Sequence, residues 1–423
     1  MNKKKTNTST IKLTENMQYS SFILPNGLRI IHLPSNSPVS YCGFAVNAGT
    51  RDEKPGQFGL AHFVEHALFK GTQKRKAWHI LNRMENVGGE LNAYTTKEET
   101  FLYAVCLSED IERAVELLSD LIFNSQFPAA EIEKEREVIL DEINSYEDTP
   151  SELIFDEFEN LVFSGNELGH NILGDSESLA RFTTASFRSF VDEHYRPDNM
   201  IFFSYGKTPF KKIVRLAEKY ILATKNNAPA PLKRIIPVIN PAQRIEIDKK
   251  LHQTHVVIGA RAYSTFDNKR MGLCLLNNIL GGQGMNSRLN VSLREKQGLV
   301  YTVEAGLTSY TDTGIVTIYF GCDSESKDKC LQLTHKELRR LRENKLSGVQ
   351  FAAAVKQWKG QLGISGDHNE SAALRMGKSF LHFNQYDNLP QVYQKIDTLT
   401  ADQLLEIANE IYEEKQLFSL IYQ

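Results

Sequence analysis

Residues Gly59 to Thr72 read Gly-Leu-Ala-His-Phe-Val-Glu-His-Ala-Leu-Phe-Lys-Gly-Thr. Three polar residues, His62, Glu65 and His66, interrupt an apolar run that predicts a helix. His62 and His66 are four residues apart, so on a helix they point the same way, one turn above the other. Two imidazoles placed in this way can both reach one metal ion, and zinc is the usual occupant of such a pair. Glu65 can reach the same spot, where it suits a general base better than a third ligand.

The alternative is a helix that merely carries two histidines and a glutamate among core residues. For a single histidine that interpretation would be preferred. However, the order His-x-x-Glu-His is the signature of the inverted zincins. With 11 histidines in 423 residues, chance produces about 0.02 such strings in a chain of this length. The pattern therefore favours a metal site.

A catalytic zinc site needs a third protein ligand and an open fourth position. The candidate lies in residues 128–148, a strongly helical stretch that begins with a proline and acidic residues. Glu135 and Glu142 are seven residues apart in this stretch, which is two turns, so they share one face. A charged helix face in solvent would show the same spacing. Spacing alone therefore leaves the two interpretations open.

Taken together, these segments resemble the pitrilysin family of zinc metallopeptidases, which includes insulin-degrading enzyme and the mitochondrial processing peptidase. In that family a glutamate about 75 residues after the motif completes the zinc site. Here Glu142 follows His66 by 76 positions, so the resemblance implies that Glu142 is the third zinc ligand. It also implies that Glu135 supports a ligand from behind. The segment 88–95, Gly-Gly-Glu-Leu-Asn-Ala-Tyr-Thr, resembles the edge strand of the family, and the resemblance spans the whole chain.

The composition sets broad limits on the class of protein. A chain of 423 residues with 41% hydrophobic content can bury more than one core, so two or more domains are expected. The net charge of −3 shows no basic excess that would suggest a nucleic-acid partner. Residues 1–5 are basic, but no apolar segment follows, so neither a signal peptide nor a membrane span is expected. Five widely spaced cysteines without a Cys-x-x-Cys motif are typical of buried free thiols in a reducing compartment, and we expect a cytoplasmic location.

Local patterns predict most elements of the first half of the chain. Asn26-Gly27 between two apolar runs predicts a hairpin over 22–32. Further strands are predicted over 39–48, 91–95, 100–107 and 200–205, and helices over 78–87, 110–123, 128–148, 152–163 and 183–195.

The chain also contains an internal duplication. Residues 41–48 leading to Gly59 parallel residues 254–261 leading to Gly272. On this alignment the positions of the metal motif fall on Leu275, Asn278 and Ile279, so the second copy has lost the metal chemistry. The expected fold is α+β, with two homologous domains that each contain a mainly antiparallel β-sheet packed with helices, as in processing-peptidase-like metallohydrolases. We place the zinc-binding domain at 1–225, a proline-rich linker at 226–244 and the second domain at 245–423.

The second half contributes a different motif. Arg294 and Tyr301 are seven residues apart and match an arginine and a tyrosine that, in the resembled family, bind the substrate backbone and the tetrahedral intermediate. A guanidinium and a phenol are good donors to a carbonyl oxygen that gains negative charge. The alternative is an exposed helix end followed by a strand that starts at Leu299.

These features predict a zinc-dependent endopeptidase that hydrolyses short or unfolded peptides in a closed chamber. The peptide would pair as an added strand with residues 91–94, with Asn92 and Ala93 central. The alternatives are a subunit of a heteromeric processing peptidase and a non-catalytic scaffold homologue. Single-chain relatives use four such units, with the zinc in the first and the arginine–tyrosine pair in the fourth. This two-unit chain is therefore expected to form a homodimer whose active site is completed in trans.

Overall fold

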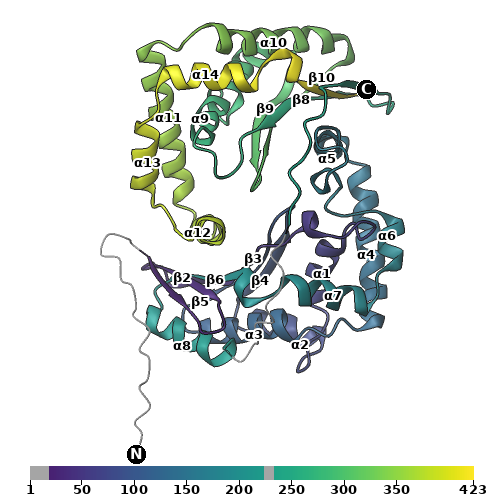
Figure 1. The fold of residues 1–423 in the computed structure, drawn as a ribbon, viewed down its shortest axis with the longest axis vertical. Coiled ribbons are helices and arrows are strands. Elements are labelled where there is room, and N and C mark those ends of the chain that lie inside the picture. Colours follow the sequence, from purple (N-terminus) through teal and green to yellow (C-terminus); the bar gives the residue numbers. More distant parts are fainter. Residues whose placement is uncertain (1–18, 223–232) are drawn as a thin grey trace, which may run out of the picture.

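The computed structural model describes residues 19–222 and 233–423, and in them two β-sheets are each packed with helices (Figure 1). The first sheet has the strand order β1-β2-β6-β3-β5-β4, and the second has the order β7-β11-β8-β10-β9. The strands of the first sheet are β1 (Ser20–Ile23), β2 (Arg29–Pro34), β3 (Val39–Val46), β4 (Glu90–Thr95), β5 (Thr100–Leu107) and β6 (Met200–Gly206). Those of the second are β7 (Arg244–Ile247), β8 (Thr254–Ala262), β9 (Val300–Ser309), β10 (Gly314–Cys322) and β11 (Phe418–Tyr422).

The two sheets repeat one topology. If β2 is matched to β7, the strand orders of the two sheets coincide up to the edge strands β4 and β9. In each sheet one pair is parallel, β2 with β6 and β7 with β11, and the other pairs are antiparallel. The predicted α+β fold with two related, mainly antiparallel sheets is therefore confirmed.

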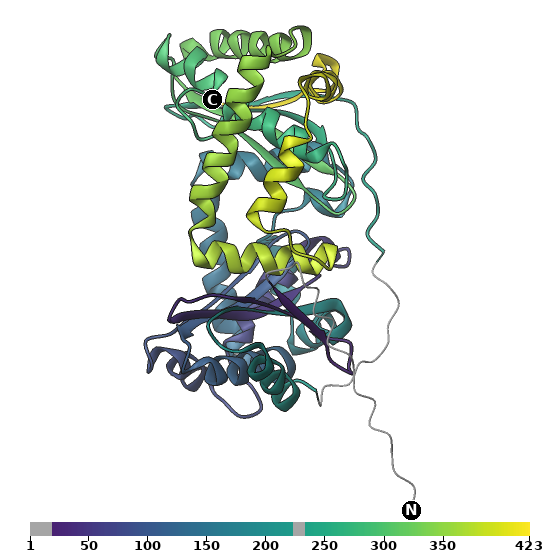
Figure 2. The same ribbon diagram turned by 90° about the vertical axis from the view of Figure 1, so that its left-hand side faces the viewer.

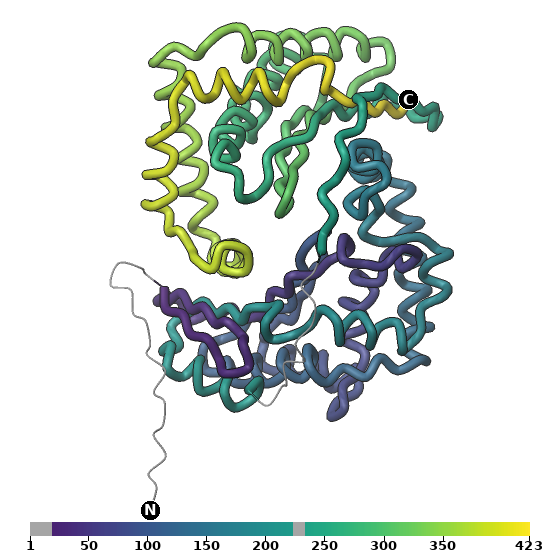
Figure 3. Tube along the Cα trace, viewed as in Figure 1, coloured from purple at the N-terminus to yellow at the C-terminus, as the bar shows by residue number. Residues whose placement is uncertain are grey.

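The helices lie around these sheets as Figure 3 traces along the chain. The first half contains α1 (Leu60–Leu68), α2 (Ala77–Glu85), α3 (Ile111–Asn124), α4 (Ala129–Glu147), α5 (Pro150–Val162), α6 (Ser176–Arg181), α7 (Thr184–His194) and α8 (Phe210–Tyr220). The second half contains α9 (Arg270–Gly281), α10 (Lys327–Glu343), α11 (Gly348–Gly366), α12 (Asn369–Phe383), α13 (Leu389–Asp397) and α14 (Ala401–Ile411). Each half has its own apolar core, in which one face of the sheet packs against helices of the same half.

Each half also covers the free face of the other half's sheet with one helix. Helix α5 packs on the second sheet, where Ile154 and Phe158 share a buried cluster with Val257. Helix α12 packs on the first sheet, where Met376 and Phe380 lie in one cluster with residues of β5 and β6. Figure 2 shows α12 lying across the first sheet. The two halves therefore interlock through reciprocal packing in addition to their covalent connection.

Most of the elements predicted from local patterns are present. The hairpin forms between β1 and β2, and the helix that carries the metal motif is α1. Part of the predicted linker, 226–232, lies outside the described residues, and 233–243 has no regular secondary structure. The division into domains at 1–225 and 245–423 stays a prediction. All five cysteines are free thiols, and four of them are buried. Among the described helices, none combines the length and apolar character that a membrane crossing requires.

Candidate metal centre

Helix α1 is held in a fixed place by its apolar face and by the residue that precedes it. Phe63, Val64 and Leu68 are completely buried in the first core. The residue before the helix, Gly59, has a φ of 88°, and a Cβ there would lie 2.5 Å from the carbonyl oxygen of Leu173. Only glycine combines this left-handed conformation with so close an approach. The motif side chains are therefore presented from a rigid element.

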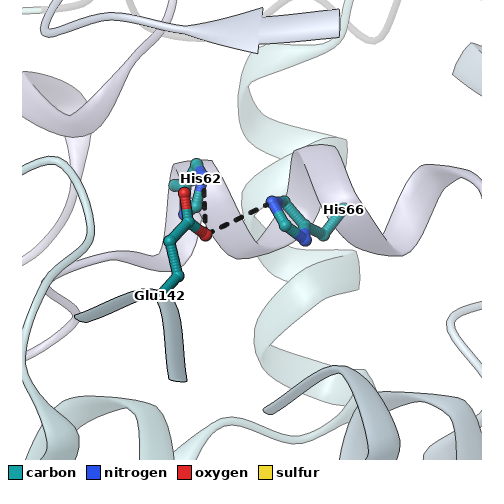
Figure 4. A group of neighbouring side chains, drawn as sticks. All are labelled: His62, His66 and Glu142. Atoms are coloured by element: carbon teal, nitrogen blue, oxygen red, sulfur yellow. Dashed lines mark ion pairs between the residues drawn. The ribbon is translucent and has the colours of Figure 1, made fainter. Parts of the chain in front are cut away.

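His62, His66 and Glu142 converge on one point, as Figure 4 shows. Their ligand atoms all lie within 4.8 Å of one another, although Glu142 comes from α4 and the histidines from α1. The Nε2 atoms of His62 and His66 are each 3.9 Å from Oε2 of Glu142. The packing of α4 against α1 thus brings together the three residues that the sequence predicted as ligands.

Electrostatics favour the ligand form of His62. Burial, and secondarily the neighbouring His66 ring, lower the pKa of His62 to about 3, so this imidazole is neutral at physiological pH. A neutral imidazole is the form that binds a metal. Two imidazoles and a carboxylate on facing helices form the donor set of a catalytic zinc site, and an ion of that size fits between them.

Glu135 supports the site from behind His66. Its Oε1 lies 2.9 Å from Nδ1 of His66, and its Oε2 lies 2.5 Å from Nζ of Lys70. Glu135 lies two turns before Glu142 on α4, so one helix supplies both a ligand and the partner of another ligand. Nothing in the local sequence pattern around Lys70 indicates this contact.

Glu65 lies next to the three ligands and is nearly buried, with 8% of its surface exposed. Oε2 of Glu65 accepts a hydrogen bond of 2.6 Å from the hydroxyl of Thr95, the last residue of β4. Burial raises the pKa of the Glu65 carboxyl, and Glu142 adds to this, whereas Thr95 opposes it. Sequence reasoning missed Thr95, because nothing in its local pattern indicates a contact with a residue 30 positions earlier.

Strand β4 forms the edge of the first sheet, and among residues 19–222 and 233–423 its one paired strand is β5. Asn92 and Ala93 are at its centre, opposite Tyr103 and Leu102. Both residues are half-buried, and the other side of the strand is open to an added strand. The predicted substrate-binding residues therefore lie on the edge strand whose last residue contacts Glu65.

Arg294 and Tyr301 belong to the second half. Arg294 lies in a short π-helix, Asn290–Glu295, and Tyr301 is the second residue of β9, the edge strand of the second sheet. The Tyr301 side chain is 82% exposed. Figure 1 shows β9 in the upper half of the molecule and α1 in the lower half. Within one chain, therefore, the structure does not bring this pair together with the metal centre.

Comparison with known proteins identifies both halves. The family model described as "Insulinase (Peptidase family M16)" matches residues 30–176, and the one described as "Peptidase M16 inactive domain" matches residues 181–358. A Streptomyces coelicolor protein named an uncharacterized zinc protease is 32% identical over 406 residues, which cover 94% of this chain and 88% of that protein. A Rickettsia felis protein with the same description is 33% identical over 406 residues, covering 95% of this chain and 96% of that protein.

Solved structures share the same fold. A protease from Helicobacter pylori gives a TM-score of 0.87 at 20% identity and covers 96% of this chain and 99% of that chain. A Pseudomonas fluorescens structure described as a peptidase M16 inactive domain gives 0.88 at 19% identity, with coverages of 96% and 98%.

The fold and the metal centre together define a protein of the zinc-protease class. The chain belongs to peptidase family M16, the insulinase family. The resemblance drawn from the sequence is therefore confirmed.

Proposed function

We propose that this protein is a zinc-dependent endopeptidase that hydrolyses short or unfolded peptides. The observation that carries the proposal is the convergence of His62, His66 and Glu142 within 4.8 Å, with Glu65 beside them. These three side chains would hold the ion. When bound, zinc would polarise the carbonyl of the scissile bond and lower the pKa of a water molecule toward neutrality.

Glu65 acts as the general base in this proposal. Its carboxylate accepts a proton from the water that attacks the scissile carbonyl, and it later returns a proton to the leaving amine. Burial raises the pKa of Glu65, which brings the group closer to the pH at which a general base works best. The hydroxyl of Thr95 holds one carboxylate oxygen, so the other stays available for the proton.

Strand β4 binds the substrate. Within the part of the chain that the structure describes, its outer edge has no strand partner, so an extended peptide could add to the sheet there, beside Asn92 and Ala93. This mode of binding requires an extended substrate, so unfolded chains and short peptides are favoured. Because backbone pairing contacts few side chains, it imposes little sequence preference.

Arg294 and Tyr301 would complete the site from a second copy of the chain. Both are on the second sheet, whereas the metal centre is beside the first. In a two-fold dimer, the second half of one protomer can enclose the metal centre of its partner, which gives a chamber between the chains. There the guanidinium and the phenol would donate to the substrate backbone and to the oxygen that gains charge.

The test compares Glu65→Gln with the wild type. The variant keeps the size of the side chain but cannot accept the proton, so we expect near-normal zinc content and peptide cleavage reduced at least about a hundredfold. Zinc is measured by atomic absorption, and cleavage is measured with an internally quenched peptide before and after chelation. Full turnover by Glu65→Gln would show that Glu65 is not the general base, and chelator-resistant cleavage would rule out the zinc mechanism.

A further inference from the structure

The turn between β9 and β10 reaches from the second sheet to the first half of the chain, where it meets Arg51. Asp312 in this turn accepts two hydrogen bonds from the guanidinium, from Nη1 to Oδ1 at 2.8 Å and from Nη2 to Oδ2 at 2.6 Å. Nη1 also donates to Oε1 of Glu98 at 2.7 Å, and Nη2 donates to the carbonyl oxygen of Ile235 at 2.8 Å. The Arg51 side chain is completely buried.

A second arginine and the neighbouring threonine extend this contact. Arg234 forms a two-pronged pair with Asp52, at 3.0 Å from Nε and 2.9 Å from Nη2. Thr311 donates to the carboxylate of Glu98 twice, from its backbone N–H at 2.8 Å and from its hydroxyl at 2.7 Å. We call the five ionised side chains the charged junction: Arg51, Asp52, Glu98, Arg234 and Asp312.

The energetics of the charged junction favour a role in positioning. Its most exposed member, Asp312, has 19% of its side chain accessible. The cost of taking such charges out of water offsets most of their mutual attraction, so buried ion pairs add little net stability. Two-pronged pairs of arginine with carboxylate nevertheless demand one geometry, because both N–H groups must face both oxygens. The junction therefore fixes where the turn of the second half sits on the first half.

The segment that carries Arg51 is joined to the end of strand β4. Thr50 and Arg51 donate backbone hydrogen bonds to the carbonyl oxygens of Thr96 and Lys97, at 3.2 Å and 2.8 Å. Thr96 directly follows Thr95, which holds Glu65. The segment that contains Arg51 is therefore connected, through Thr96 and Thr95, to the proposed general base Glu65.

The same segment anchors the start of α1. Glu53 directly follows Asp52, and its buried carboxylate accepts from the backbone N–H of Gly59 at 3.0 Å and from that of Ala61 at 2.7 Å. An anion in this position satisfies free N–H groups at the helix N-terminus and is stabilised by the helix dipole. Ala61 directly precedes His62, so a shift of the anchored segment would move a metal ligand.

We propose that Arg51 and Asp312 are positioning residues for the metal centre. Through them, the turn of the second half holds the segment that anchors α1 and the end of β4, and so sets the position of His62 relative to Thr95, which orients Glu65. The inference rests on the zinc site of the proposed function. It assigns to the second half of each chain a role in its own metal centre, in addition to any contribution it makes to a partner.

The experiment measures the zinc affinity of Asp312→Asn by competition with a chromogenic chelator. This variant keeps the shape of the side chain but removes one charge of the pair, and we expect zinc to bind about tenfold more weakly, as when a partner of a ligand is lost. The matched control is Glu370→Gln at another contact between the halves, where Glu370 on α12 accepts from the hydroxyl of Tyr103 at 2.7 Å. This control also weakens the packing between the halves but does not contact α1 or its anchor, so its zinc affinity should equal that of the wild type.

Thermal unfolding of the metal-free proteins, recorded in parallel, separates positioning from a general loss of stability. The proposal is supported if Asp312→Asn loses zinc affinity while Glu370→Gln, at a similar melting temperature, does not. Thr311→Val is measured alongside, because it removes only the hydroxyl that donates to Glu98 and leaves all charges in place. Wild-type zinc affinity in Asp312→Asn would overturn the proposal, as would equal losses in Asp312→Asn and the control. If Asp312→Asn does not fold, the zinc affinity of Thr311→Val decides in the same way. A wild type that binds no zinc would instead overturn the proposed function, and this inference with it.

Discussion

Nδ1 of His66 lies 2.9 Å from Oε1 of Glu135, and this contact decides which nitrogen of the ring faces the metal centre. With its N–H donated to the carboxylate, His66 keeps the lone pair of Nε2 directed toward Glu142, 3.9 Å away. Lys70 bonds the other oxygen of Glu135 and holds the carboxylate in place. The orientation of one ligand is therefore set by two residues that do not themselves reach the ion.

Glu135→Ala should weaken zinc binding roughly ten- to a hundredfold without unfolding the protein, because His66 loses the partner that fixes its tautomer and its rotation. The affinity is measured by chelator competition. Glu137→Ala is the matched control. Glu137 is exposed on the same helix, so this variant protein should bind zinc as tightly as the wild type does. Equal affinities in the two variants would show that Glu135 does not support the site.

Thr95→Val should lower kcat about tenfold and leave KM nearly unchanged, because it removes the hydrogen bond that orients Glu65 but leaves the backbone of β4 intact. Thr95→Ser restores the hydroxyl and should recover most of the activity. Zinc content should be the same in all three proteins. A rise in KM alone would mean that Thr95 serves substrate binding and not the base.

The contact between α12 and the first sheet should make stability depend on pH through Glu99. This buried carboxylate accepts from Nε2 of His382 at 2.6 Å and from Nζ of Lys378 at 3.1 Å. Burial alone would raise the pKa of Glu99, but these two partners and Thr96 outweigh it and lower the pKa to about 2. A lowered pKa in the folded state stabilises the protein above the unfolded pKa of about 4.5, and this stabilisation is lost as pH falls toward 2.

Urea unfolding of Glu99→Gln and of the wild type at several pH values tests this dependence. At pH 7 the free energy of unfolding should be up to about 3 kcal/mol lower in the variant. Between pH 4.5 and pH 2 the difference should shrink, because protonation then removes the charge from the wild type as well. A difference that is constant over this range would show that ionised Glu99 does not stabilise the contact.

The sequence predicted those parts of the molecule whose signals are local. The four-residue spacing of His62 and His66 needs only the geometry of one helix, and the periodic apolar residues of α3 and α4 predict helices from neighbouring positions. The third ligand could not be predicted from a local signal. Glu142 has the same local pattern as any exposed acidic helix, so only the family resemblance selected it, and the structure then brought it to the histidines.

The sequence contains no comparable local signal for contacts between residues that are far apart in the chain. Thr311 and Glu98 are 213 positions apart, and each lies in a turn whose local pattern only marks the end of a strand. Residues 369–383 show an amphipathic helix that fits many surfaces, and nothing in them indicates that its apolar face covers the sheet of the other half. Which element such a helix or turn packs against depends on how the whole chain folds in three dimensions.

Completion of the active site by a second chain can be tested with two inactive variants. Glu65→Gln and Arg294→Ala should each be inactive alone, the first for lack of a base and the second for lack of a donor to the substrate. When the two variants are mixed under conditions that allow subunits to exchange, half of the dimers are mixed. In a mixed dimer completed in trans, one site receives both defects, whereas the other combines Glu65 of one chain with Arg294 of its partner. Activity should therefore recover to about a quarter of the wild-type value.

The mixing experiment is followed by peptide cleavage over time, with size-exclusion chromatography to confirm that the species are dimers. The matched control mixes Glu65→Gln with His62→Ala. Both of these defects lie in the same half, so every site of a mixed dimer keeps one of them and no activity should return. If each active site were complete within one chain, the first mixture would behave like this control, because every chain would then carry one defect in its own site. Recovery in the first mixture and none in the control is thus an outcome that only a shared site produces.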